Sequence, residues 1–333
     1  MTSLRVIFAN RCPGTFWSIE ELFRSIAAAM PASVSTDWSC APTGRANLKS
    51  LLANLLWFRG LKGADVIHQT GDIHYAILAD WGTPVVLTIH DLRFFDEARG
   101  LKRWLFWLLW LYLPCMRANR ITVISEFTRE RLLACCPLSR DKVSVVPNCV
   151  AVGFQQSPKP WPVSKARILA VGTTANKNLE RLIEACAGFD VEVVVLGVPS
   201  PAQREHIARH GVAHTFRSKL SGAEVADLYA ECDLVAFVST YEGFGMPILE
   251  AQAVGRPVLT SDLSPMREVA GDGALLVDPL DVPSIRNGLK SILDDEALRK
   301  ALVAQGFGNV KKYSAEEIAG KYAKLYRDLL DER

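Results

Sequence analysis

The sequence lacks the patterns that define several common classes of protein. Its eight cysteines form no C-x-x-C pair, which disfavours zinc ligation and disulfides and predicts buried thiols in a reducing compartment. It contains neither a Walker A loop nor a G-x-G-x-x-G turn, and no D-x-D pair of metal ligands. ATPase and dehydrogenase functions are therefore disfavoured.

Signals for membrane insertion are also missing. The chain opens on Met1 to Asn10, a run typical of a strand rather than a signal peptide, so a cytoplasmic location is expected. The apolar run from Trp104 to Pro114 has eleven residues, whereas a membrane-spanning helix needs roughly 20.

What is present is the composition of a well-cored globular protein with an uneven charge. The 333 residues are 49% hydrophobic and 22% charged, enough for two ordinary domains. Residues 1–160 carry 18 Lys/Arg and 12 Asp/Glu, and residues 161–333 carry 20 and 24. The N-terminal half is the better surface for an anionic partner or membrane.

Short apolar runs alternate with helical patterns along the whole chain. Ten strands are predicted at 4–9, 64–68, 85–90, 121–124, 143–146, 168–171, 191–197, 234–238, 257–260 and 274–277. Such alternation predicts an α/β protein with two Rossmann-like, doubly wound parallel-sheet domains and a central cleft between them. Between the first two strands, one helical face carries leucines at 48, 51, 52, 55 and 56, a pattern typical of core packing.

Domain boundaries follow from a proline-rich segment. Ser157 to Pro162 has three prolines in six residues, which excludes regular structure and predicts an interdomain linker. The expected domains are 1–160 and 161–315. A final helix, 316–333, is expected to pack back on the first domain.

The most informative segment is a nonapeptide, Glu242-Gly-Phe-Gly-Met-Pro-Ile-Leu-Glu250. It follows a buried strand and leads into a helix, with Pro247 suited to the first turn and glycines that allow close backbone approach. A loop of this kind presents backbone N–H groups to an anion such as phosphate. The two carboxylates suit sugar hydroxyls, although Glu250 alone is also typical of a dipole-stabilising residue.

A second phosphate-type turn contains Gly172, Thr173, Thr174 and Lys177. It joins the first strand of the second domain to the next helix, so the lysine, the threonine hydroxyls and backbone amides are placed to meet a diphosphate. A solvated lysine near a helix start is the alternative.

The first domain offers two further polar groups directly after strands. His90 and Asp91 follow one strand, where a histidine can donate to a sugar oxygen or a leaving phosphate, although a lone histidine is usually structural. Ser125 and Glu126 follow the next strand, and Glu126 suits helix capping equally well.

The segment 99–120 is apolar on every face and basic at its ends. It carries Trp104, Trp107 and Trp110, with Arg or Lys at 99, 102, 103, 117 and 120 and no acidic residue between Gly100 and Ser125. Two interpretations remain open for 104–114: a core helix, or an interfacial helix on an anionic membrane surface, which the tryptophans and bases favour.

Together these segments resemble the family 4 retaining glycosyltransferases, which have the GT-B fold. Glu242 to Glu250 resembles the E-x7-E motif of that family. Further similar segments span most of the chain, at 88–92, 123–128, 145–148, 171–173, 177–179, 220–229, 255–258, 268–271 and 277–279. The match is specific for the family and weak for the substrate.

The resemblance implies a role for each matching residue. Glu242 would accept hydrogen bonds from donor-sugar hydroxyls, Glu250 would bind the ribose, and Lys177 would neutralise the diphosphate. His90 would contact the donor sugar from the facing domain. The predicted catalytic residues are His90, Lys177 and Glu242; the predicted donor-binding residues are Gly172, Thr173, Thr174, Lys177, Gly243, Phe244, Gly245, Met246 and Glu250. No metal is implied.

The sequence departs from the family pattern in two loops. Thr173 and Asn176 stand where many relatives carry arginines. The loop from Ala9 to Thr15 has one glycine where a pair is usual, and Arg11 is a candidate to replace a missing phosphate contact. The candidate acceptor-side residues are Arg11, Gly14, Thr15, Asp91, Ser125 and Glu126.

The expected activity is transfer of a hexose from a nucleotide diphosphate sugar to a lipid-linked or lipopolysaccharide-type acceptor, without metal and with retention. The residues resemble mannosyltransferases of bacterial surface polysaccharide assembly, which makes GDP-mannose the first expectation for the donor. Expected partners are the nucleotide sugar, the acceptor and an anionic membrane surface, with no nucleic acid. The alternatives are a nucleotide-sugar 2-epimerase of the same fold and an inactive binding protein.

Overall fold

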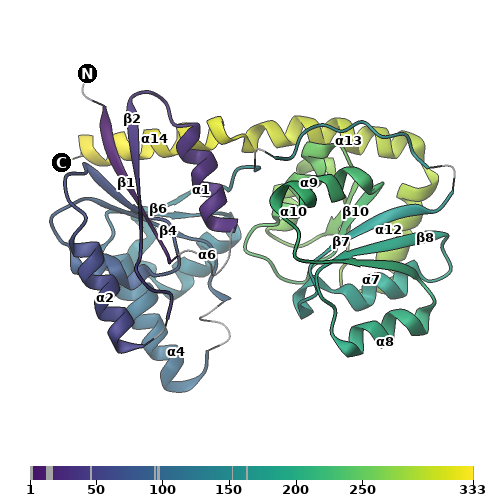
Figure 1. Ribbon diagram of the computed structural model, residues 1–333, viewed down its shortest axis with the longest axis horizontal. Coiled ribbons are helices and arrows are strands. Elements are labelled where there is room, and N and C mark those ends of the chain that lie inside the picture. Colours follow the sequence, from purple (N-terminus) through teal and green to yellow (C-terminus); the bar gives the residue numbers. More distant parts are fainter. Residues whose placement is uncertain are drawn as a thin grey trace. The chain divides into compact units, whose positions relative to one another are not determined.

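The computed structural model describes residues 3–12, 18–45, 47–93, 95, 98–151, 153–162 and 164–332. It contains two compact units, each built on its own six-stranded parallel sheet (Figure 1). The first unit comprises Met1–Cys149 with Ala315–Arg333, and the second comprises Val150–Ser314.

The first unit has the strand order β2-β1-β3-β4-β5-β6. Its strands are β1 (Leu4–Asn10), β2 (Val34–Cys40), β3 (Val66–Gln69), β4 (Val85–Ile89), β5 (Arg120–Val123) and β6 (Val143–Val145). Its helical segments are α1 (Ser18–Ala28), α2 (Leu48–Arg59), η1 (His74–Ala79), α4 (Gly100–Phe106), η2 (Trp107–Tyr112), α5 (Leu113–Arg117), α6 (Glu126–Cys135), η3 (Pro137–Lys142) and α14 (Ala315–Asp331).

The second unit has the strand order β12-β11-β10-β7-β8-β9. Its strands are β7 (Ala166–Val171), β8 (Val191–Leu196), β9 (Ala213–Arg217), β10 (Leu234–Phe237), β11 (Val258–Ser261) and β12 (Leu275–Val277). Its helical segments are η4 (Ala175–Lys177), α7 (Leu179–Cys186), α8 (Pro201–His210), α9 (Gly222–Glu231), α10 (Met246–Val254), α11 (Met266–Ala270), η5 (Gly271–Gly273), α12 (Val282–Asp294), α13 (Glu296–Val310) and η6 (Lys311–Tyr313).

All ten predicted strands are present, and the α/β class is confirmed. Two strands escaped prediction, β2 and β9, and both form sheet edges. Their sequences, VSTDWSC and AHTFR, are mostly half-buried or exposed, because an edge strand is not covered like a central one. They therefore lack the apolar run that identifies a buried strand. All eight cysteines are thiols, five of them buried.

The C-terminal helix α14 contributes to the core of the first unit. Tyr322 and Tyr326 are buried with Phe8 and Phe23, and the yellow helix in Figure 1 runs along this sheet. The Tyr326 hydroxyl lies 2.6 Å from Nδ1 of His68 on β3, whose Nε2 lies 2.7 Å from Oγ1 of Thr88 on β4. Burial lowers the pKa of His68 to about 3, so the ring is neutral at physiological pH.

Replacement of Tyr326 by phenylalanine should destabilise the protein by about 1–3 kcal/mol, because Nδ1 of a fully buried His68 loses its partner. Urea denaturation of the full chain, followed by tyrosine and tryptophan fluorescence, measures the change. An unchanged midpoint would contradict the proposed contribution of this hydrogen bond.

The leucine face of α2 is not a core face, contrary to the sequence-based prediction. The buried side chains of this helix are Ser50, Asn54 and Phe58, spaced four residues apart on another face. Asn54 Nδ2 donates to the Tyr75 hydroxyl at 2.8 Å and to the carbonyl of Thr43 at 3.0 Å. These hydrogen bonds satisfy the buried amide nitrogen of Asn54 and hold the leucines on the outward face.

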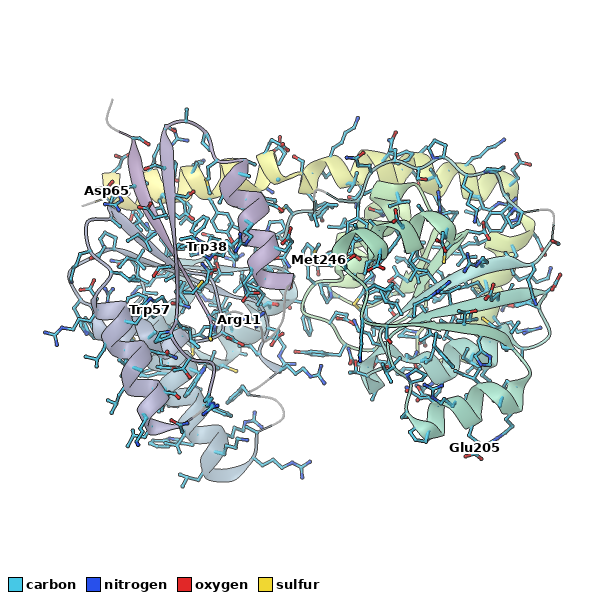
Figure 2. All side chains as sticks on the ribbon, viewed as in Figure 1. Arg11, Trp38, Trp57, Asp65, Glu205 and Met246 are labelled. Atoms are coloured by element: carbon cyan, nitrogen blue, oxygen red, sulfur yellow. The ribbon has the colours of Figure 1, made fainter. Side chains whose placement is uncertain are left out.

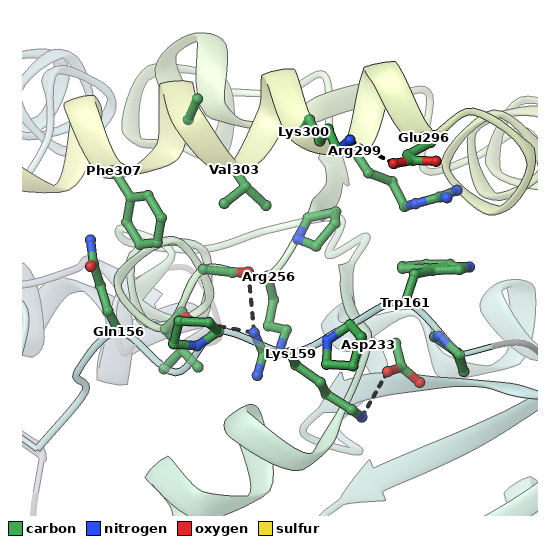
Figure 3. Close-up of a pocket in the computed structure, with 17 residues that line it drawn as sticks. Gln156, Lys159, Trp161, Asp233, Arg256, Glu296, Arg299, Lys300, Val303 and Phe307 are labelled. Carbon is green, nitrogen blue, oxygen red and sulfur yellow. Dashed lines mark hydrogen bonds and ion pairs between the residues drawn. The ribbon is translucent and has the colours of Figure 1, made fainter.

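The boundary between the units lies at residue 149 rather than at 160, because the proline-rich segment binds to the second unit. The Ser157 N–H donates to the Val254 carbonyl, and the Arg256 guanidinium donates to the Ser157 carbonyl at 2.8 Å. Lys159 pairs with Asp233 at 2.7 Å. The segment borders a cavity of about 820 Å³ (Figure 3), where Arg299 stacks on Trp161.

One part of the segment 99–120 lies in the core and another part is exposed. Leu111 and Cys115 belong to the core, whereas α4 has no buried residue. Arg117 is buried, donating to the carbonyls of Asp80 and Thr83, and Arg120 pairs with Glu332. These two arginines therefore do not form part of an exposed basic flank. Within the described chain, no helix has the length and hydropathy needed to cross a bilayer.

Candidate active site

The second unit gathers the predicted donor residues where its strand order reverses. Strands β7 and β10 are neighbours, although β8 and β9 follow β7 in sequence. In doubly wound sheets, the carboxyl ends of two such strands form the usual ligand site. The loop 172–178 follows β7 and the loop 238–245 follows β10, so the topology places both predicted motifs at one edge.

Lys177 and Glu242 are in direct contact in this edge. Lys177 Nζ lies 2.7 Å from Oε1 of Glu242, and both side chains are largely buried, at 20% and 15% exposure. The ammonium also lies 4.7 Å from the centre of the Phe237 ring, a favourable cation–π distance. The two residues that sequence assigned separately to diphosphate and sugar thus form one ion pair.

Gly172 makes room for the lysine. Its φ of +92° lies in the region that favours glycine. A Cβ at this position would lie 2.9 Å from Cγ and 3.0 Å from Cε of Lys177, closer than packed carbon atoms approach. The glycine therefore determines where the lysine stem lies.

Two asparagines missed as site residues hold the two loops together. Asn176 Nδ2 donates to the Tyr241 carbonyl at 2.9 Å and to Oε1 of Glu242 at 3.3 Å. Asn178 is buried with φ of +60°, and its Nδ2 donates to the carbonyls of Val238 and Pro279. The left-handed preference of asparagine is a weak signal that sequence analysis could have used.

The helix that follows Glu242 begins without a side-chain cap. Gly245 is its N-cap with φ of +116°, and Pro247 lies in the first turn. An uncapped N-terminus presents backbone N–H groups and the positive end of the helix dipole, which favours an anion. The phosphate site expected from the sequence would lie at this helix start and stays a prediction.

Glu250 lies one turn into α10 and binds a residue that sequence analysis did not assign. Its carboxylate accepts a hydrogen bond from Tyr229 of α9, whose side chain is buried. Burial raises the pKa of Glu250 to about 6, although the Tyr229 hydroxyl and the Lys177 charge act in the opposite direction. The carboxylate is therefore ionised at neutral pH and protonated in mild acid.

The remaining donor candidates lie on the same two loops. Thr173 donates to the Val198 carbonyl at 3.0 Å, and Thr174 donates to Oδ1 of Asn176 at 2.7 Å. Phe244 is buried against Tyr313, whereas Gly243 and Met246 are half-buried. The hydroxyls thus organise the loop, and Phe244 anchors it.

In the first unit, His90 follows β4 and is hydrogen-bonded to the residue that follows the neighbouring strand β3. Its Nε2 donates to the Thr70 carbonyl at 2.9 Å, and burial lowers its pKa. The nitrogen left for a ligand is Nδ1, an acceptor while the ring is neutral. The neighbouring Asp91 accepts from the backbone N–H of Arg93 at 3.0 Å.

Arg11 lies at the carboxyl end of β1, in the position labelled in Figure 2. It is buried, and its guanidinium pairs with Glu20 at 2.7 Å and with Asp72 at 3.4 Å. An anionic ligand would therefore meet a charge that two carboxylates already balance. Gly14 and Thr15 of the same loop lie outside the described residues.

Ser125 is the N-cap of α6, and its side chain accepts from the Thr128 N–H at 3.1 Å. Glu126 is exposed in the first helical turn, 3.4 Å from Arg129. The capping residue is thus the serine, and the glutamate adds charge at the helix N-terminus.

Among the described residues, one group of three has metal-type donor atoms within 4.8 Å of one another: Glu184, His206 and His210. They lie on α7 and α8 and include none of the predicted site residues. This group does not test the need for a metal in the reaction, and metal independence stays a prediction.

Comparison with known proteins identifies the family of the chain. Residues 7–154 match the model described as Glycosyltransferase Family 4, and residues 154–308 match the model Glycosyl transferases group 1. The chain belongs to glycosyltransferase family 4, and it has the GT-B fold.

Two curated relatives and one solved structure illustrate the similarity. O-antigen chain mannosyltransferase B of Escherichia coli is 37% identical over 100 residues, 30% of this chain and 26% of that protein. MMP alpha-(1->4)-mannosyltransferase of Mycolicibacterium hassiacum is 28% identical over 290 residues, 79% and 70% of the two chains. The match to the first relatives found spans only about a quarter of their length.

Sucrose-phosphate synthase of Thermosynechococcus elongatus superposes with a TM-score of 0.76 at 18% identity, over 100% of both chains. At this identity the superposition establishes the fold alone.

Proposed function

We propose that this protein transfers a hexose, most simply mannose, from a nucleotide diphosphate sugar to a lipid-linked or lipopolysaccharide-type saccharide, with retention and without metal. The observation that carries the proposal is the Lys177–Glu242 pair beside the uncapped start of α10. Mannosyltransferases among the relatives support the choice of sugar. GDP-mannose is accordingly the first donor to test.

A diphosphate entering this site would recruit the Lys177 ammonium away from Glu242 or share it. The carboxylate so released is a good acceptor for sugar hydroxyls, which is the role that the family resemblance implies for it. The backbone N–H groups at the start of α10 would donate to the other phosphate oxygens. Donor binding would thus replace the Lys177–Glu242 ion pair by two contacts with the ligand: Lys177 with the diphosphate, and Glu242 with the sugar hydroxyls.

In the proposed reaction, the bond between the sugar anomeric carbon and the diphosphate oxygen breaks while the acceptor hydroxyl oxygen bonds to the same carbon and face. The acceptor proton passes to the departing diphosphate oxygen. Lys177 stabilises the charge that develops on that oxygen, so no enzymatic nucleophile is required. His90, through Nδ1, would accept a hydrogen bond from a hydroxyl of the donor sugar.

A lipid-linked acceptor would require the protein to work at a membrane surface on the cytoplasmic side. The segment 99–120 is the proposed contact, and α4 within it has no buried residue. The acceptor itself would lie on the first unit, near Arg11, Asp91 and Ser125.

Thermal unfolding with GDP-, UDP-, ADP- and dTDP-sugars tests the proposal. A specific donor at 100 times its Kd stabilises the native state by about 2.7 kcal/mol, so the preferred nucleotide is visible directly. Product analysis with that donor and no acceptor then separates a transferase from a 2-epimerase. No stabilisation by any nucleotide sugar would refute a donor site in the second unit.

Donor affinity should fall as the pH is lowered through about 6, because the Glu250 carboxylate must be ionised to accept from the ribose hydroxyls. At one pH unit below that pKa about a tenth of the sites are ionised, so affinity drops about tenfold between pH 7.5 and 5. Isothermal titration across this range measures it. In Glu250→Gln the slope should vanish; an equal slope in the variant would assign it to another group.

A further inference from the structure

The helix α8 carries two histidines on one face at its C-terminal end. His206 and His210 are one helical turn apart, and their ring centres lie 4.4 Å from each other. A capping box at Ser200 and a left-handed Gly211 define the two ends of the helix. Two histidines at positions i and i+4 of a helix have the spacing with which imidazoles share one metal ion.

Packing in the second unit brings a carboxylate of α7 to these two rings. Ile207 of α8 is buried in the same core cluster as Leu182 and Ile183 of α7, and Figure 1 shows the two helices side by side. Glu184 of α7 is exposed beside this contact. One donor atom from its carboxylate and one from each imidazole all lie within 4.8 Å of one another.

Each imidazole already donates one N–H to a backbone carbonyl. Nε2 of His206 donates to the Glu180 carbonyl at 3.1 Å, and Nδ1 of His210 donates to the His206 carbonyl at 2.9 Å. Because a carbonyl can only accept, these hydrogen bonds place the proton on that nitrogen, and in a neutral ring the other nitrogen carries the lone pair. Metal-binding histidines are usually oriented by a second hydrogen bond of this kind.

The charges around the three side chains favour a cation. Glu180 lies one turn before Glu184 on the same face of α7, so it adds a second carboxylate to this face. The C-terminal end of α8 carries the negative end of its helix dipole. The neighbouring bases have partners of their own: Arg181 donates to an asparagine side chain at 2.9 Å, and Arg209 pairs with a glutamate of its own helix at 3.3 Å.

We propose that Glu184, His206 and His210 bind a divalent transition-metal ion of the zinc type, which links α7 to α8. Two imidazoles and one carboxylate are a donor set that zinc accepts, with water at the remaining position. Ligand atoms about 2.0–2.1 Å from a tetrahedral zinc are about 3.3 Å apart. The side chains must therefore close in by about 1–1.5 Å on binding, which an exposed glutamate on a helix surface can do.

The same two helices support the loop 172–178, which carries Lys177. The helix α7 begins directly after this loop, and Gln203 in the first turn of α8 donates to the Thr173 carbonyl at 2.9 Å. An ion near the C-terminal ends of both helices would hold these two supports of the loop in one arrangement. The proposed ion is structural, and the sugar transfer proposed above does not depend on it.

Titration of the chelator-treated full-length protein with zinc chloride, followed by calorimetry, tests the site. Wild type should bind zinc saturably, and zinc should raise its thermal unfolding midpoint. Glu184→Gln and, separately, His210→Ala should each weaken this binding at least about tenfold, because each removes one of the three ligands. Since Glu184 is exposed, its replacement tests the site without disturbing the core.

His214→Ala is the matched control, because His214 is an exposed histidine of the same unit outside the group of three, and it should bind zinc like wild type. Absence of saturable wild-type binding would overturn the proposal. Undiminished binding by both ligand variants would also overturn it and would assign the zinc to other groups, such as the half-buried thiols of Cys12, Cys40 and Cys135. Nucleotide-sugar thermal shifts of the metal-free protein report on the donor site separately, so either proposal can fail alone.

Discussion

Replacement of Lys177 by alanine should lower kcat/KM for nucleotide-sugar turnover by about two to three orders of magnitude. The proposed reaction develops charge on a diphosphate oxygen, and loss of one preorganised donor at such a site typically costs this much. The variant also leaves Glu242 without its cation, so a carboxylate would repel the incoming diphosphate. Steady-state kinetics with the donor identified by thermal shift provide the measurement.

The matched control is Lys290→Ala, whose exposed lysine pairs with Asp294 within α12 and should leave turnover unchanged. The double variant Lys177→Ala/Glu242→Gln completes a thermodynamic cycle. Because the two side chains are in contact, the second substitution should add much less than it does alone. Wild-type kinetics in Lys177→Ala would refute the diphosphate assignment.

Gly172→Ala should reduce donor affinity and turnover at least about tenfold, because the new Cβ would occupy the space of the Lys177 stem. The positive φ adds about 1–2 kcal/mol of backbone strain. Stability and turnover should therefore both fall. The backbone strain accounts for the loss of stability, and displacement of Lys177 accounts for the loss of turnover.

Gly211→Ala separates the two effects. Gly211 ends α8 with φ of +64°, and a Cβ there meets nothing within 4 Å. This variant should show the backbone strain as a lower unfolding midpoint while its kinetics stay normal. Equal losses of turnover in both variants would contradict the steric role of Gly172.

Most of the strands could be predicted from the sequence because buried parallel strands are continuous apolar runs. The strands that carry the site, β7 and β10, are of this kind. The edge strands β2 and β9 were not predicted, because their polar residues suit the uncovered sheet edge and interrupt the apolar run. The leucines of α2 misled for a related reason: helical periodicity identifies an apolar face but not what covers it.

The nonapeptide, Lys177 and Gly172 were predicted as site residues because each follows a strand and has a chemistry suited to phosphate or sugar. The direct contact between Lys177 and Glu242 could not be predicted, because the two residues are 65 positions apart in the sequence. Asn178 and Tyr229 were missed because each acts through a partner distant in sequence, a backbone carbonyl of Val238 and the carboxylate of Glu250.

By itself, the sequence determined the fold class, the family and the residue types of the predicted donor loops, because these depend on local periodicity and on short motifs. Only the tertiary structure decided which side chains meet. The strand order brings β7 next to β10 and so pairs Lys177 with Glu242. Hydrogen bonds of Asn54 turn the leucines of α2 toward solvent. Both outcomes depend on contacts between residues far apart in the chain, which no local pattern encodes.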